Sequence, residues 1–151
     1  MCALGGGIEE RSHLWRRVIF RFDNKIIVRG SIRDAPGGGR AISGSLPIMS
    51  EAIVLDNVEI FIRLDPTLMT RISRRFHTAE PGDIIYRPQI PALSIFADYA
   101  DIYEPVERIG MIDRLDLPKI EELSSNAKSI LFVSIEKAES VEYEEETEES
   151  R

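Results

Sequence analysis

The sequence predicts one mostly β domain, and three observations support this fold class. Many short runs alternate between apolar and polar residues, which is the pattern of half-buried strands. Turn signals rich in glycine, proline, asparagine and aspartate separate these runs at close spacing. Few stretches show helical spacing. We therefore expect about eight or nine short strands with one or two short helices, a composition that favours a closed barrel or a sandwich.

The first expected element is a hairpin of two alternating runs. Facing residues of an antiparallel pair point to the same side of a sheet, so Phe22 has to face Ile26. This pairing requires a three-residue loop, Asp23–Lys25, because a two-residue turn would place apolar residues opposite charged ones. Either Asn24 or Lys25 then takes a left-handed backbone, which asparagine tolerates better.

Two features near this hairpin raise the question of anion binding. The outer face carries Arg17, Arg21 and Arg29, which form either an anion-binding stripe or, as we favour, a solvated sheet face. The run Gly37–Gly39 follows, and backbone N–H groups of such loops can bind phosphate. It lacks the Gly-Lys-Ser/Thr ending of a P-loop and the spaced glycines of a dinucleotide motif, so phosphate binding there is not favoured.

A second strand pair, 51–55 with 58–64, surrounds the turn signal Asp56-Asn57. The alternation in its second strand is clean. Its inward set is Val58, Ile60, Ile62 and Leu64, and its outward set is Glu59, Phe61 and Arg63.

The other elements follow from the same signals. In chain order they are a short helix within 40–46, strands at 84–86 and 92–97, an acidic loop with Asp98, Asp101 and Glu104, a strand at 106–112, a short helix at 119–124 and a last strand at 129–137. The segment 68–78 suits a helix and a strand equally well.

The last strand is apolar on both sides. Leu131 and Val133 share one parity, whereas Ile130 and Phe132 share the other. Such a strand usually lies inside a sheet or is covered on both faces. We therefore expect it to be central and to pair with the first strand.

Length and charge divide the chain into three parts. Residues 1–12 contain three successive glycines and are expected to form a flexible leader, and 13–137 are long enough for one domain with its own core. Residues 138–151 form a disordered acidic tail, whose seven glutamates and one arginine hold −6 of the net charge of −7. The tail is a tether, a competitor for the basic face or, most simply, a solubility device.

Composition disfavours several classes of function. Cys2 is the only cysteine and His13 and His77 are the only histidines, so we expect no disulfide, no metal site and no cofactor. The chain has neither a long apolar run nor a signal-peptide pattern, which favours the cytoplasm over a membrane. Nucleic-acid binding is not expected, because the body is nearly neutral and the tail would repel phosphate. The oligomeric state is left open.

Three stretches carry a resemblance to a known family. They are Glu59–Ile62, then Pro81–Pro88 followed by Ala92–Phe96, and Pro105–Ile112. In order and spacing they resemble the uncharacterised bacterial and archaeal family of small cyclophilin-like β-barrel proteins. The resemblance implies a closed cyclophilin-like β-barrel with one or two short helices. The chain departs from the family pattern where Arg87 replaces a tryptophan and where Ala97-Asp98 replaces Phe-Gly.

The resemblance says much about fold and little about activity, because one fold hosts unrelated functions. We expect a noncatalytic or weakly catalytic binding module for a small anionic molecule or peptide. Its cleft would lie near the turn at 86–88 and the basic segment at 74–77, since arginines recognise carboxylates and phosphates through paired donors. The candidate ligand-binding residues are Arg63, Arg74, Arg75, His77, Tyr86 and Arg87.

The alternative is peptidyl-prolyl cis-trans isomerisation, which the cyclophilin resemblance invites. That reaction needs an apolar proline pocket and a positioned cationic donor. Arg75-Phe76-His77 offers the right residue types, but the chain lacks the cyclophilin run of glutamine, two glycines and aspartate. The sequence identifies no catalytic residue for either function.

Overall fold

The computed structural model describes residues 14–72, 75–126 and 130–138, and these contain nine strands, two helices and two 3-10 turns. The mostly β prediction is confirmed. The strands are β1 Trp15–Phe22, β2 Ile26–Arg33, β3 Ile48–Leu55, β4 Glu59–Arg63, β5 Phe76–Ala79, β6 Asp83–Arg87, β7 Ala92–Phe96, β8 Ala100–Ile112 and β9 Leu131–Lys137. The helices are α2 Gly38–Ser43 and α3 Leu117–Ser125, and the turns are η1 Pro66–Leu68 and η2 Arg114–Asp116.

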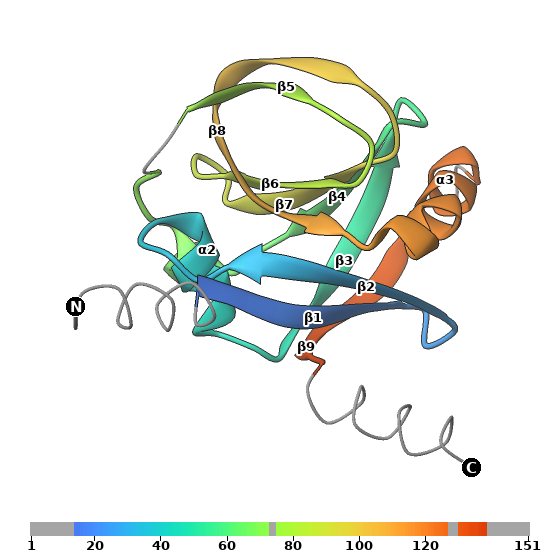
Figure 1. Ribbon diagram of the computed structural model, residues 1–151, viewed down its shortest axis with the longest axis horizontal. Coiled ribbons are helices and arrows are strands. Elements are labelled where there is room, and N and C mark those ends of the chain that lie inside the picture. The colour runs from blue at the N-terminus through green and yellow to red at the C-terminus, as the bar shows by residue number, and fades with distance from the viewer. Residues whose placement is uncertain (1–13, 73–74, 127–129, 139–151) are drawn as a thin grey trace, which may run out of the picture.

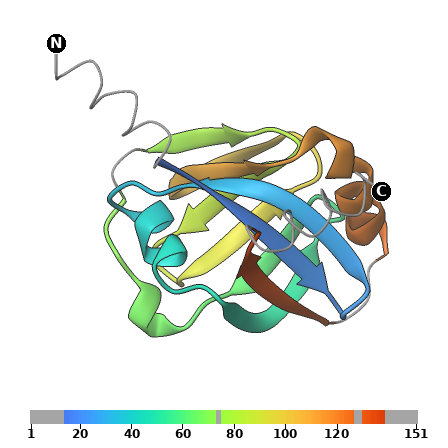
Figure 2. The same ribbon diagram turned by 60° about the horizontal axis from the view of Figure 1, so that its bottom comes forward.

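Eight of these strands pair in a ring. Their order is β2-β1-β9-β3-β4-β7-β6-β8, and β8 also pairs with β2 (Figure 1). The strand β5 stands outside this ring and pairs antiparallel with β8 alone among the described strands. Figure 2 shows β9, in dark red, next to β1, in dark blue, in agreement with their antiparallel pairing.

The β1–β2 hairpin has the predicted register. Phe22 faces Ile26, so the loop has three residues. The left-handed residues are Asp23 and Asn24, with φ of 52° and 58°, so Asn24, the favoured of the two candidates, is confirmed. Lys25 instead donates its backbone N–H to the Phe22 carbonyl at 2.9 Å, which closes the turn.

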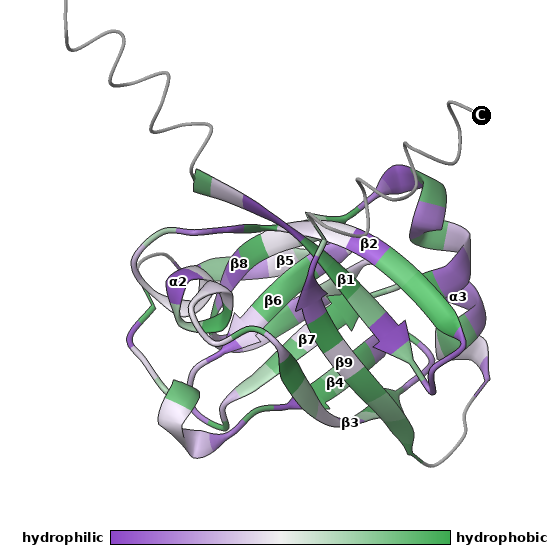
Figure 3. Ribbon diagram, turned by 90° about the horizontal axis from the view of Figure 1, so that it is seen from below, coloured by the Kyte–Doolittle hydropathy of each residue, from purple (hydrophilic) through white to green (hydrophobic). Residues whose placement is uncertain are grey.

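The main core lies on one face of the ring strands. Phe20 and Phe22 stack there with centroids 6.5 Å apart, among fully buried aliphatic residues of β2, β4, β6 and β7. Hydrophobic and hydrophilic residues alternate along β1 and β9 in Figure 3. The alternation read from the sequence is therefore the alternation between core and outer face.

A second, smaller apolar cluster lies on the opposite face of β6 and β7. It consists of Ala79, Ile85, Phe96, Ile102 and Val106. The β5 strand and the first half of β8 supply three of these residues and cover that face; we call this pair of segments, Phe76–Ala79 with residues 100–106, the β5–β8 arm (Figure 1). The arm therefore buries part of the outer face of the ring. The cavities described below border the arm.

The structure corrects two expected elements and assigns parts of a third that the sequence left open. The acidic segment with Asp101 and Glu104 is not a loop but the first half of the 13-residue β8. Outward-facing charge made it look like a loop, although its inward residue Ile102 is 6% exposed. The helix expected within 40–46 begins earlier, at Gly38, and ends at Ser43. The ambiguous segment 68–78 contains the end of η1 and the start of β5.

The last strand is central, as predicted, because β9 lies between β1 and β3. Its two faces differ in burial. Phe132 is 66% exposed and Ile130 is 52% exposed, while Leu131 and Val133 are buried in the core. The arm that covers the outer face of β6 and β7 does not pair with β9, so that outer side of β9 keeps its contact with water.

The predicted leader 1–12 and nearly all of the tail 138–151 lie outside the described residues. Ala138, where the tail was expected to begin, is fully buried and donates its N–H to the Arg17 carbonyl at 3.1 Å. No helix within the described ranges is long and apolar enough to cross a bilayer.

Candidate functional site: two cavities beside the β5–β8 arm

Two cavities of similar size border the arm. The arginine cleft has a volume of about 530 Å³ and is lined by residues that include Trp15, Arg33, Arg75, Phe76, Arg108 and Met111. The Arg87 cavity has a volume of about 520 Å³ and is lined by residues that include Glu59, Arg87, Tyr99, Asp101, Tyr103 and Glu104. Both volumes lie in the range of small-molecule sites.

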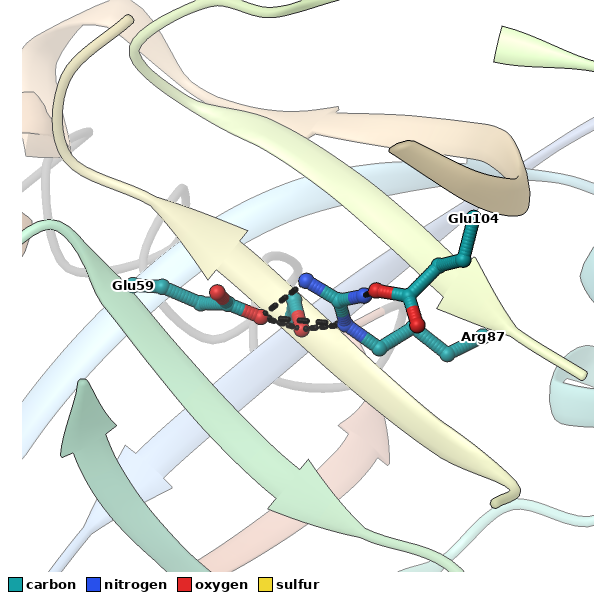
Figure 4. A network of polar contacts seen from close by, with 4 residues as sticks. Glu59, Arg87 and Glu104 are labelled. Carbon is teal, nitrogen blue, oxygen red and sulfur yellow. Dashed lines mark hydrogen bonds and ion pairs between the residues drawn. The ribbon is translucent and has the colours of Figure 1, made fainter. Parts of the chain in front are cut away.

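A buried ionic network forms the polar centre of the Arg87 cavity (Figure 4). The Arg87 Nη2 and Nε atoms donate to Glu59 Oε2 at 2.7 Å and 3.1 Å, and Nε also donates to Ser94 Oγ at 3.0 Å. The Ser94 hydroxyl donates to the same Oε2 atom. Arg87 and Glu59 are 8% and 9% exposed, so two opposite charges are held together with most of their surface out of contact with water.

A second carboxylate completes this network from the arm. Arg87 Nη1 donates to Glu104 Oε1, and the Glu104 side chain is half exposed. Arg87 thus lies between one buried and one solvent-facing carboxylate (Figure 4). The network joins β4, β6 and β7 of the ring to β8 of the arm.

Strand register explains why these side chains meet. Ser94 faces both Phe61 on β4 and Ile85 on β6, so it shares their side of the sheet. Glu59 is two residues before Phe61, and Arg87 two residues after Ile85, so each lies on that same side. All of them therefore point to the outer face that the arm covers.

Sequence reasoning found Arg87 and missed its partners. Alternation placed Glu59 outward, which is correct for its direction and wrong for its exposure, because the arm buries this part of the outer face. Ser94 had no distinguishing signal. The one usable signal for Glu104 was its place among the acidic residues that precede a strong strand pattern.

The arginine cleft lies on the other side of the arm. Trp15 faces Arg33 across the β1–β2 hairpin, while Phe76 begins β5 and Arg75 directly precedes it. The Arg108 guanidinium lies 5.7 Å from the Phe76 ring centroid, in a cation–π arrangement, and 3.7 Å from the buried Asp83 carboxylate. Burial raises the pKa of Asp83, although its hydrogen bond from the Glu80 N–H and the charge of Arg108 oppose that shift.

The glycine-rich run beside this cleft already holds an anion from the chain itself. Gly38 N–H donates to Glu107 Oε1 at 3.0 Å, and Gly37 has a φ of 114°, which favours glycine. A Cβ at Gly37 would lie 2.8 Å from that carboxylate. Glu107 thus occupies the backbone N–H donor of Gly38 in this run.

Two arginines of the outer stripe are ion-paired. Arg17 donates from both terminal nitrogens to Asp113, at 2.7 Å and 2.6 Å, and this contact holds the pKa of the Asp113 carboxyl below its ordinary range. Arg21 lies 3.7 Å from Glu136. These pairs support the solvated, ion-paired face over an anion-binding stripe.

The predicted ligand-binding residues do not share one cleft. Arg75 lines the arginine cleft and Arg87 the other cavity, while His77 is exposed on β5 and Arg63 is exposed at the end of β4. Tyr86 points into the main core. Arg74 lies outside the described residues.

Tyr86 is fully buried and has a structural hydrogen-bond pair. Its hydroxyl donates to the Leu68 carbonyl at 2.6 Å and accepts from the Thr70 N–H at 2.9 Å. Burial raises the pKa of this phenol. These contacts tie the segment after η1 to the core.

Comparisons with known proteins relate this chain to two solved structures. A hypothetical protein from Archaeoglobus fulgidus, AF2241, aligns with 83% of this chain and 96% of its own, at a TM-score of 0.62 and 21% identity. McbB, solved in complex with tryptophan, aligns with 80% of this chain, at a TM-score of 0.65 and 17% identity. The alignment spans 44% of McbB, so this chain matches less than half of that protein.

No known protein-family model matches the sequence, and no curated protein does. At these identities the two structural likenesses bear on fold alone. They support a small, mostly β fold, and the cyclophilin-like resemblance stays a prediction.

Proposed function

We propose that this protein is a noncatalytic or weakly catalytic binding module that holds a small anionic molecule, or the carboxylate of a peptide, in the arginine cleft. One observation carries the proposal: Arg33 and Arg75 both line the cleft, and neither side chain has an ion-pair or hydrogen-bond partner among the described residues. An unpaired guanidinium presents its donors to a carboxylate or phosphate in a planar, two-pronged geometry.

The walls of the cleft favour an anion that carries an apolar group. Trp15 is 50% exposed and Met111 is 45% exposed, so the cleft leaves apolar surface in water that a ligand could cover. Phe76 contributes a further ring. Burial of such surface contributes about 25 cal/mol per Å² before the costs of association.

The experiment uses Trp15, the only tryptophan of the chain, as an intrinsic fluorescent reporter. Benzoate and phenyl phosphate are titrated, with benzamide as the uncharged analogue. We expect saturable changes in Trp15 emission with both anions and weaker ones with benzamide. Arg33→Gln and Arg75→Gln should each weaken anion binding by about tenfold, the value of one charge-assisted hydrogen bond.

The matched control is Arg114→Gln, which removes the same charge from an exposed residue of η2 that does not line the cleft. It should leave the affinity unchanged. Equal affinities of the wild-type protein and the Arg33→Gln/Arg75→Gln double variant would contradict the proposal, as would equal affinities for benzoate and benzamide.

We also propose that the ring of strands is a closed cyclophilin-like β-barrel, and that the protein acts in the cytoplasm. The pairing of Ser31 with Met111 between β2 and β8 supports closure, together with the sequence resemblance. Interstrand proton contacts between these two residues in solution would test it.

No contact among the described residues favours peptidyl-prolyl isomerisation, so that alternative stays a prediction from the resemblance.

A further inference from the structure

The Arg87 cavity has the architecture of a second, separate ligand site. Its apolar floor includes Phe96, which is 2% exposed, and Ile102, which is 6% exposed. Its polar centre is the buried pair of Arg87 with Glu59, and Figure 4 shows Glu104 approaching this pair from the arm. The cavity therefore combines buried charge and apolar surface in one concave space.

The two oxygens of the Glu59 carboxylate differ in their partners. Oε2 accepts hydrogen bonds from Arg87 Nε, Arg87 Nη2 and Ser94 Oγ. Oε1 accepts no hydrogen bond from the described residues. If it were fully buried it would be a buried polar atom without a partner, and Glu59 has no such atom. Water therefore reaches Oε1. Because Glu59 as a whole is 9% exposed and lines the cavity, Oε1 is an available acceptor at the cavity floor.

The charge of the cavity lining is negative. Asp56, Glu59, Asp101 and Glu104 are four carboxylates, against the single guanidinium of Arg87. Arg87 is already ion-paired with two of them. A concave surface with apolar walls concentrates this field and attracts a cation.

Two aromatic side chains stand at the open side of the cavity. Tyr99 is 67% exposed and Tyr103 is 94% exposed, and both belong to the lining. Exposed tyrosine rings beside carboxylates can receive both the charge and the apolar body of an organic cation, since a ring face attracts positive charge. A bare metal ion would use neither ring. The described residues also contain no group of three or more histidine, cysteine, aspartate or glutamate side chains placed to hold a metal ion.

We propose that the Arg87 cavity binds a small organic cation, an amine or guanidinium group on an apolar or aromatic body. The charged group hydrogen-bonds to Glu59 Oε1 and pairs with Glu104 and Asp101, while the body packs against Tyr99 and the apolar floor. This site is independent of the arginine cleft, which selects the opposite charge.

The test is a backbone amide NMR titration of the full chain with benzylamine, which is protonated at neutral pH. Benzyl alcohol and benzoate are the uncharged and anionic analogues. We expect saturable shifts at residues 99–104 with benzylamine alone. Glu104→Gln should weaken benzylamine binding by about tenfold, and Asp101→Asn by about threefold, because Asp101 is exposed.

Controls separate this site from general electrostatics and from the arginine cleft. Glu51→Gln removes the same charge from an exposed residue of β3 and should leave benzylamine affinity unchanged, as should Arg33→Gln. Glu59→Gln should abolish saturable benzylamine binding if its amide spectrum shows a folded protein. If this variant does not fold, the variants of the exposed Glu104 and Asp101 test the proposal. Absence of saturable shifts at 99–104, or equal affinities of wild type, Glu104→Gln and Asp101→Asn, overturns the proposal. Failure of benzoate to bind the arginine cleft does not affect it.

Discussion

Arg87 connects the ring to the arm through charge rather than through apolar packing. Its guanidinium contacts Glu59 and Ser94 on one side and Glu104 on the other. A buried ion pair of this kind contributes little net stability, because desolvation offsets the attraction between the charges. Removal of one partner is far more costly, because the other charge stays buried without compensation.

Arg87→Met should therefore destabilise the protein strongly. It leaves the buried Glu59 side chain, which belongs to a residue that is 9% exposed, without its guanidinium partner, and we expect the free energy of unfolding to fall by about 3–5 kcal/mol. Urea denaturation followed by circular dichroism measures this change. The double variant Glu59→Gln/Arg87→Met should lose less than Arg87→Met alone. If the double variant is the less stable of the two, the buried charge is not the cause.

Asp113 gives the protein one defined source of pH dependence. Its hydrogen bonds from Arg17 hold its pKa below the ordinary aspartate value of about 4. A carboxyl whose folded pKa is lowered stabilises the protein above the unfolded pKa, and this contribution disappears as the pH falls through the folded pKa.

Asp113→Asn should lower the free energy of unfolding at pH 7 by about 1 kcal/mol, the upper end for a partly exposed pair. The difference from wild type should shrink as the pH falls below about 4. Urea denaturation between about pH 2 and about pH 7, a range that brackets the unfolded pKa of about 4, measures it. Glu51→Gln, at an exposed position of β3, is the control and should show no such trend. A difference that stays constant over this range would contradict the assignment.

Side-chain direction was predictable for single residues, whereas exposure was not. Parity alone placed Phe22 opposite Ile26 and directed Glu59 away from the core, both correctly. Whether an outward residue meets water depends on what folds over it. Glu59 lies under the arm and Phe132 does not, and no local pattern distinguishes them.

At the scale of elements, the contact between β2 and β8 is the feature that completes the ring. It involves three residue pairs, and a glycine stands on each strand, Gly30 opposite Ile112 and Gly110 opposite Ile32. These glycines let the two backbones approach closely. A Cβ at Gly30 would lie 2.8 Å from the Met111 carbonyl oxygen, and one at Gly110 would collide with the Ser31 carbonyl oxygen.

Gly110→Ala should separate β2 from β8 and lower the free energy of unfolding by about 1–3 kcal/mol, as overpacking does. Gly44→Ala is the matched control, because a Cβ there would meet only the Arg40 carbonyl oxygen, at 3.2 Å, and the residue has ordinary helical backbone. Thermal unfolding of both variants provides the comparison. A Gly110→Ala protein as stable as wild type would show that the two strands do not approach so closely in solution.

Elements were predictable from the sequence where one face packs against the core and the other face contacts water. The β1–β2 hairpin and α3 fall in this class, and the pairing of β9 with β1 followed from its apolar sequence. The first half of β8 lacks a clean pattern, because the charged Glu104 lies between Ile102 and Val106 on the side that faces the ring. Its strand structure depends on its pairing with β5. That pairing joins residues more than about 20 positions apart, so a short stretch of sequence does not reveal it.

At the scale of the whole molecule, the charges are distributed unevenly around the β5–β8 arm. One cavity carries arginines and the other mostly carboxylates, although the body of the chain is close to neutral. The net charge of −7 therefore describes neither site. Composition shows only that the body of the chain is nearly neutral, whereas the fold sorts its charges into separate places.

The ring of pairings also has a consequence for association between copies of the chain. A strand with an unpaired edge offers backbone N–H and C=O groups to another molecule, which is a common route to aggregation. Among the described strands, only β5 lacks a second partner, and it has four residues and an irregular register at His77. Within the part of the chain that the structure describes, edge-to-edge growth of the sheet is thus restricted to one short strand.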